Sequence, residues 1–127
     1  MLSENEIMGF IPTKNGAKAR AFYEGQLGLR FISDDPFALV VESHGTIIRI
    51  TKIENFTPFP FTILGWRVSN IEAEVGSFTS RGVSFERFPG LDQNDLGIWT
   101  SPDRTKVAWF KDPDGNLLSL SQHLGRT

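Results

Sequence analysis

The sequence predicts an α+β fold built from two tandem βαβββ modules. Three observations lead to this prediction. The order strand-helix-strand-strand-strand occurs twice, the second half repeats the first, and 127 residues suit one domain with a proper core. In the repeat, LGLRF (27–31) matches RGVSF (81–85), and ESHGTIIRIT (42–51) matches DPDGNLLSLS (112–121). We therefore expect module 1 over about 6–54, a linker over about 55–60 and module 2 over about 61–123.

The first module begins with a strand at 7–13, IMGFIPT. Asn15 is a good N-cap for a helix from about Ala17 to Gln26, whose apolar side is Ala19, Phe22 and Tyr23. A second strand follows at 29–33, and 37–43 and 46–53 form a hairpin around Ser43–Gly45. The proline-broken segment 54–61, ENFTPFPF, is typical of a linker.

The second module repeats this order, beginning with a strand at 61–69. Ser69 or Asn70 caps a helix that carries Ile71, Val75 and Phe78 on one face. We expect a strand at 83–88, a long loop at 89–104, and a last hairpin at 106–111 and 116–122 around the turn Asp112–Gly115.

Composition excludes several classes of function. The net charge of −2 and the absence of a run of like charges argue against nucleic acid or an anionic membrane as a partner. No stretch is apolar enough to cross a bilayer and no signal peptide is visible, so a cytoplasmic location is expected. The lack of cysteine excludes disulfides, thiolate metal sites and cysteine nucleophiles. Eleven Phe and three Trp suit a dense core or an apolar ligand pocket.

Two segments carry a resemblance to a known family: AKARAFYEGQLGLRF (17–31) and GIWTSPDRTKVAWFKDPDGNLLSL (97–120). With the internal repeat, they make nearly the whole chain similar to the vicinal oxygen chelate superfamily of glyoxalases, extradiol dioxygenases and bleomycin-type resistance proteins. The resemblance implies paired modules that form a curved mixed sheet around a cleft, a small-molecule ligand in that cleft, and a homodimer.

Metal-using members of this family hold a divalent ion with His, Glu or Gln from the first and last strands of each module. The corresponding positions here are Met8, Arg49, Ile63 and Ser119. A thioether, an alkyl chain and a hydroxyl are poor ligands for such an ion, and a guanidinium repels it. We therefore expect no metal and no other cofactor, and the sequence leans against an enzyme.

Arg49 is the first candidate for ligand binding. Alternation in TIIRITKI (46–53) places Ile48 and Ile50 on one face and Arg49 on the other, where a planar fork of donors could hold an anion or a carbonyl group. The alternative is a structural ion pair, with a carboxylate such as Glu42 or Glu54, or an arginine at the sheet edge that reaches water.

The other candidates are mainly aromatic. Trp109 would face the cleft if Ala108 and Phe110 face the helix, and Trp99 in the long loop either fills the core or covers a pocket. The remaining candidates are Phe10, Leu39, Arg67 and Ser119. The two histidines, one in a turn and one in the C-terminal tail, are not expected to bind a metal.

Three hypotheses follow from these residues. The first is a metal-free small-molecule-binding protein of the resistance type, which sequesters a toxic or antibiotic compound. The second is a metal-dependent lyase, isomerase or dioxygenase with non-standard ligands. The third is an accessory or regulatory domain whose cleft is vestigial.

Overall fold

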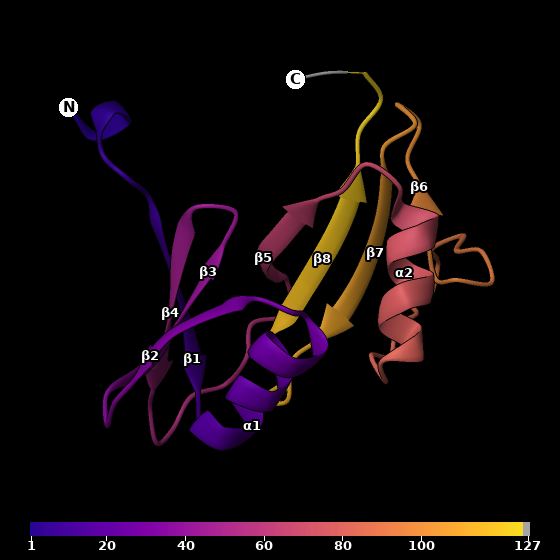
Figure 1. Ribbon diagram of the computed structural model, residues 1–127. Coiled ribbons are helices and arrows are strands. Elements are labelled where there is room, and N and C mark those ends of the chain that lie inside the picture. Colours follow the sequence, from indigo (N-terminus) through magenta and orange to yellow (C-terminus); the bar gives the residue numbers. More distant parts are fainter. Residues whose placement is uncertain (126–127) are drawn as a thin grey trace. The chain divides into compact units, whose positions relative to one another are not determined.

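The computed structural model describes residues 1–125, and the chain divides into two units, Met1–Thr57 and a second that begins at Pro58 (Figure 1). The predicted α+β fold with two βαβββ modules is confirmed, because each unit holds one four-stranded mixed sheet and one helical segment. The division falls inside the stretch 55–60. Within the described residues, no helix has the length and apolar character needed to span a membrane.

The first unit begins with a short 3₁₀ turn and then follows the expected order. Its elements are η1 (Leu2–Glu4), β1 (Met8–Thr13), α1 (Gly16–Arg20), a π-helical continuation η2 (Ala21–Gln26), β2 (Arg30–Asp34), β3 (Ala38–Ser43) and β4 (Thr46–Lys52). The sheet order is β1-β4-β3-β2, with β1 parallel to β4 and the other pairs antiparallel. Strands β1 and β2 are therefore the edges of this sheet.

The core of the first unit lies between the helix and one face of the sheet. Asn15 starts the helix as expected, since its side chain accepts a hydrogen bond from the Lys18 backbone N–H at 3.1 Å. Ala19, Phe22 and Tyr23 are buried, and so are the strand residues of matching alternation. These are Ile11, Leu39, Val41, Ile48 and Ile50. The period-two pattern of the sequence therefore predicted Ile48 and Ile50 on this face correctly.

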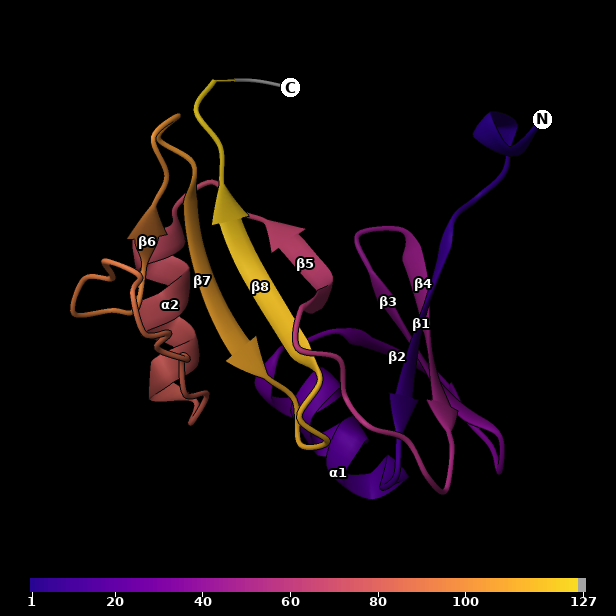
Figure 2. The ribbon, with the colours of Figure 1, turned by 180° about the vertical axis from the view of Figure 1, so that it is seen from behind.

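The second unit contains β5 (Thr62–Arg67), α2 (Ile71–Ser80), β6 (Trp99–Thr100), β7 (Lys106–Lys111) and β8 (Leu117–Gln122). Its sheet order is β5-β8-β7-β6, which Figure 2 shows from behind. Asn70 caps α2 by accepting a hydrogen bond from the Ala73 backbone N–H at 3.1 Å. The side chain of Gln122, at the end of β8, accepts another from the Ile71 N–H at 2.8 Å. The helix is thus tied to the sheet that it covers.

The strand expected at 83–88 does not form, and part of the expected loop is a strand instead. Both segments pair with the same edge of β7, each along a different part of it. Glu86 donates its backbone N–H to the Trp109 carbonyl at 2.8 Å, while Trp99 lies in register with Val107 further along β7. The Gln93 side chain holds the loop between them, accepting from the Phe88 N–H and donating to the Glu86 and Gly97 carbonyls. One edge shared by two short segments leaves neither a full ladder.

The predicted turn at Asp112–Gly115 is present and tightly bonded. The buried Asp112 carboxylate accepts hydrogen bonds from the Asp114 N–H, the Asn116 N–H and the Asn116 side-chain amide, each at 2.9 Å. Gly115 has φ = +89°, a conformation that glycine adopts without strain. The β7–β8 hairpin therefore has a rigid end.

Candidate functional site

Each sheet has one face packed on its own helix and one face that is not; we call the second the helix-free face. In the first unit, Arg49 on β4 lies on this face, in register with Phe10 on β1 and Val40 on β3. Phe10 is 63% exposed and Arg49 is half-buried. The helix-free face of the first sheet thus combines a large exposed apolar side chain with a guanidinium.

The Arg49 side chain makes no hydrogen bond or salt bridge with any described residue of its own unit. The proposed partner Glu42 is instead paired with Arg30, whose Nε donates to the Glu42 Oε1 at 2.6 Å. Backbone N–H groups of Ala38 and Phe37 hold the pKa of the Asp35 carboxyl below its usual value, and the charge of Arg49 adds to this effect. The guanidinium therefore keeps its donors available.

Leu39 does not belong to the helix-free face, and this expectation has to be corrected. Leu39 is fully buried and in register with Ile50, so it is part of the core between the sheet and the helix. The physical reason is the alternation of side chains along β3, which places Val40 rather than Leu39 beside Arg49.

The helix-free face of the second sheet has a small centre and an aromatic side. Ser119 on β8 lies between Gly65 on β5 and Trp109 on β7. A Cβ atom at Gly65 would lie 2.7 Å from the Ser119 Oγ, so only glycine leaves this hydroxyl undisturbed. The half-buried Ser119 hydroxyl has no hydrogen-bond partner among the described residues, so it can bond a ligand.

Three aromatic side chains form a cluster beside Ser119. The Trp109 and Trp99 ring centroids are 6.2 Å apart, and Phe88 meets Trp109 edge-to-face at 5.4 Å. All three are half-buried. On β7, Ala108 and Phe110 are buried on the face toward the helix and Trp109 lies on the other face, as the sequence pattern predicts. Trp99 reaches the cluster because β6 pairs with β7. We call Phe88, Trp99 and Trp109 the aromatic cluster.

A pocket of about 440 Å³ adjoins this cluster within the second unit. Its lining consists of Pro58, Phe59, Pro60, Phe88, Lys111, Gly115 and Leu117. Sequence reasoning missed this pocket, because it treated 54–61 as a linker. The signal was present in that segment, since a linker exposed to water rarely needs three Phe in eight residues. We call this cavity the Phe88 pocket.

Arg67 lies on the same helix-free face, near the edge of the sheet. It is exposed at the end of β5, in register with Ser121. The Ser121 hydroxyl is 3.0 Å from the His123 Nε2, so this histidine is engaged with its neighbour. His44 is exposed in the two-residue β3–β4 turn, where φ is positive at both His44 and Gly45.

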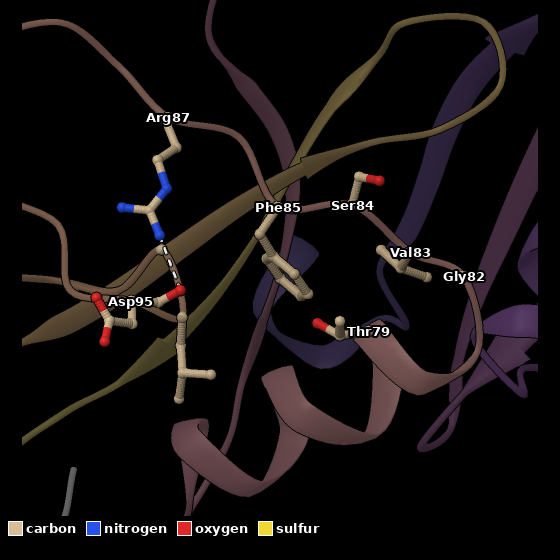
Figure 3. A pocket seen from close by; sticks show the side chains of 9 residues that line it. Thr79, Gly82, Val83, Ser84, Phe85, Arg87 and Asp95 are labelled. Atoms are coloured by element: carbon tan, nitrogen blue, oxygen red, sulfur yellow. Dashed lines mark hydrogen bonds between the residues drawn. The ribbon is translucent and has the colours of Figure 1, made fainter.

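A second pocket, of about 360 Å³, lies between the end of α2 and the loop before β6 (Figure 3). Phe85, Val83 and Leu96 supply its apolar surface, and Thr79 and Ser84 supply hydroxyls. Arg87 donates to the Asp95 carbonyl at 2.8 Å, as the dashed line in Figure 3 shows, and to the Gln93 carbonyl at 3.4 Å. The Arg87 guanidinium is therefore already bonded to the loop rather than available to a ligand, which makes this pocket the weaker candidate.

The side chains at the four positions named in the sequence analysis do not fit the divalent ion that the family resemblance implies. Met8 and Arg49 are diagonal neighbours on adjacent strands, and Ile63 lies at the irregularity between Thr62 and Leu64 on β5. With Ser119 they offer neither carboxylate nor imidazole. Among residues 1–125, no three His, Cys, Asp or Glu side chains gather where they could hold a metal ion.

A family model identifies the chain. The model described as Glyoxalase/Bleomycin resistance protein/Dioxygenase superfamily matches residues 5–120. The chain belongs to this superfamily. No curated protein sequence matches the chain.

Solved structures of the superfamily have the same fold. A member from Sphaerobacter thermophilus DSM 20745 shares 22% identity, with 94% of this chain and 97% of the other covered and a TM-score of 0.73. TnmS3, an antibiotic binding protein from Streptomyces sp. CB03234, shares 22% identity over 94% and 95% of the chains, with a TM-score of 0.67. Lactoylglutathione lyase from Agrobacterium tumefaciens shares 10% over 93% and 92%, with a TM-score of 0.71. At these identities, the likeness establishes the fold and leaves the activity open.

Proposed function

We propose that this protein binds an apolar small molecule without a metal ion and acts by sequestration, as a resistance protein does. The observation that carries the proposal is the chemistry of the four family metal positions. Met8, Arg49, Ile63 and Ser119 supply no strong ligand for a divalent ion. Binding and sequestration need a complementary surface but no Lewis acid.

The helix-free faces supply such a surface. The aromatic cluster offers stacking area, and the free Ser119 hydroxyl offers a hydrogen bond at its edge. The Phe88 pocket, at about 440 Å³, is within the usual range of roughly 300–1,000 Å³ for small-molecule sites. On the first sheet, Phe10 and Arg49 form a separate surface of the same apolar and polar character. TnmS3 is a precedent for antibiotic binding on this fold.

The enzyme hypothesis would need metal ligands that the four family positions do not provide. A lyase, isomerase or dioxygenase of this family would have to recruit donors from elsewhere in the chain. We therefore retain it only as the outcome that a metal titration would reveal.

We also propose that the protein is a homodimer. Each sheet ends in two edge strands, and unpaired edges favour pairing with another copy. Met8 on the edge strand β1 is exposed, and so is Ile7 just before it. A closed two-fold assembly would cover such side chains.

A thermal-shift screen of small aromatic compounds on chelator-treated protein tests the binding proposal. A ligand that binds only the folded state raises the melting temperature in a concentration-dependent way. We expect hits whose shift is lost in Trp109→Ala and retained in Phe37→Ala, a control that removes an exposed phenylalanine from the first unit. A screen without hits, or hits that need an added metal ion, would contradict the proposal.

A further inference from the structure

The Phe88 pocket has one chemical feature that an apolar cavity does not need. Six of its seven lining residues are Pro, Phe, Gly or Leu, and among the described residues Lys111 is the only charged one in the lining. Lys111 is 51% exposed, so its Nζ can reach the pocket mouth while its alkyl stem covers the wall. A single cation is thus placed at an otherwise apolar site.

The ion pair of Lys111 is loose. Its Nζ is 3.6 Å from the Glu86 Oε1, which is longer than a hydrogen bond. By contrast, Lys106 at the other end of the same strand donates to the Glu72 Oε2 at 2.7 Å. A half-exposed pair at 3.6 Å contributes little to stability, so a ligand can recruit the ammonium group at little cost to the fold. Lys106, already hydrogen-bonded, serves as a matched comparison.

The pocket wall is held in place before any ligand arrives. The Asp112–Gly115 turn is fixed by three hydrogen bonds to the Asp112 carboxylate. Gly115 lies against the proline segment, since a Cβ atom there would be 3.4 Å from the Pro58 Cγ. The rings of Pro58 and Pro60 restrict the opposite wall. A preformed pocket loses less conformational entropy when it binds a ligand.

Phe88 belongs both to this pocket and to the aromatic cluster. A ligand with a planar body could therefore rest on Phe88 while a charged substituent meets Lys111. We propose that the Phe88 pocket selects aromatic anions, such as aryl sulfonates, carboxylates or phenolates, and that Lys111 is its specificity-determining residue. This inference rests on the proposed small-molecule binding and adds the class of ligand.

Two probes that differ by one charge test the inference. 8-Anilinonaphthalene-1-sulfonate and N-phenyl-1-naphthylamine share an arylaminonaphthalene body, and only the first carries a sulfonate. Fluorescence titration of the full chain should show tighter binding of the anionic probe. Energy transfer from tryptophan reports binding near the second unit, which contains all three tryptophans of the chain. Phe88→Ala should weaken both probes.

Lys111→Met should weaken the anionic probe about tenfold and leave the neutral probe unchanged, because one hydrogen bond to a charged group is lost. Lys106→Met removes the same charge from the same strand and should change neither affinity. Equal binding of the two probes, or equal losses in both lysine variants, would overturn the anion selectivity alone. Failure of both probes to bind the wild-type protein would overturn the apolar pocket as a binding site, and with it the proposed function.

Discussion

Replacement of Arg49 by alanine should weaken the binding of a ligand on the surface formed by Phe10 and Arg49 much more than it weakens the fold. The Arg49 side chain makes no hydrogen bond or salt bridge within the described residues of its unit, so the variant leaves no buried partner unsatisfied. The expected change in the free energy of unfolding is within about 0.5 kcal/mol, as for an ordinary surface substitution. A hydrogen bond from this guanidinium to an anionic or carbonyl group of a ligand contributes about 1.5–3 kcal/mol, or roughly 10- to 150-fold in Kd.

The assay is calorimetric titration of a screened ligand whose thermal shift is retained in Trp109→Ala and lost in Phe10→Ala, into wild-type protein, Arg49→Ala and Arg49→Lys, with urea denaturation of each. Arg49→Lys should recover only part of the affinity, because lysine lacks the planar fork. Arg30→Ala is the matched control and should leave the Kd unchanged. It removes the same charge from the same sheet, but the Arg30 side chain is already paired with Glu42. A large loss of stability in Arg49→Ala with an unchanged Kd would refute this reasoning and favour a structural role.

Three further predictions concern the turn, an ion pair and the assembly. Asp112→Ala should lower the free energy of unfolding by about 3 kcal/mol, because three donors lose a buried acceptor; a loss below about 1 kcal/mol in urea denaturation would contradict this. The hydrogen bond from Lys106 holds the pKa of the Glu72 carboxyl below its usual value. The contribution of this pair to the free energy of unfolding is therefore fully present at a pH above the usual pKa, and it is lost as the pH falls through the lowered pKa. Glu72→Gln should therefore be less stable than wild type at pH 7, and the difference should vanish in acid; a gap that stays constant with pH would argue against the pair. Sedimentation should show a dimer at tens of micromolar that Ile7→Lys weakens, whereas a monomer throughout would remove the dimer proposal without affecting the fold.

The repeated strand and helix pattern was enough to predict both modules, because periodicity and caps are local properties. Ile48 and Ile50 are buried on the face opposite Arg49, as their alternation requires, and Asn15 and Asn70 are the observed N-caps. Local signals do not show competition between segments. The strand expected at 83–88 does not form because Trp99 pairs with part of the β7 edge. This sharing of one edge by two segments is visible only in the folded sheet.

The candidate site was predicted in part, for the same reason. Alternation predicted the strand faces of Arg49, Ser119 and Trp109, but the sequence of β3 alone did not show which of its two faces meets the helix, and Leu39 lies on that face. The Phe88 pocket depends on contact between the 58–60 segment and the β7–β8 hairpin, which are about fifty residues apart in the chain. No pattern within a short window reports such a contact.

The most direct test of metal-independent binding is a comparison of ligand affinity with and without divalent ions. A screened ligand would be titrated calorimetrically into chelator-treated protein, and again after addition of Zn²⁺, Ni²⁺, Mn²⁺ or Fe²⁺. We predict the same Kd in all conditions, with no stoichiometric metal binding that Ser119→Ala or Arg49→Ala alters. A ligand that binds only in the presence of one metal, or a stoichiometric metal site lost on mutation of His44 or His123, would contradict the account and favour a metal-dependent enzyme.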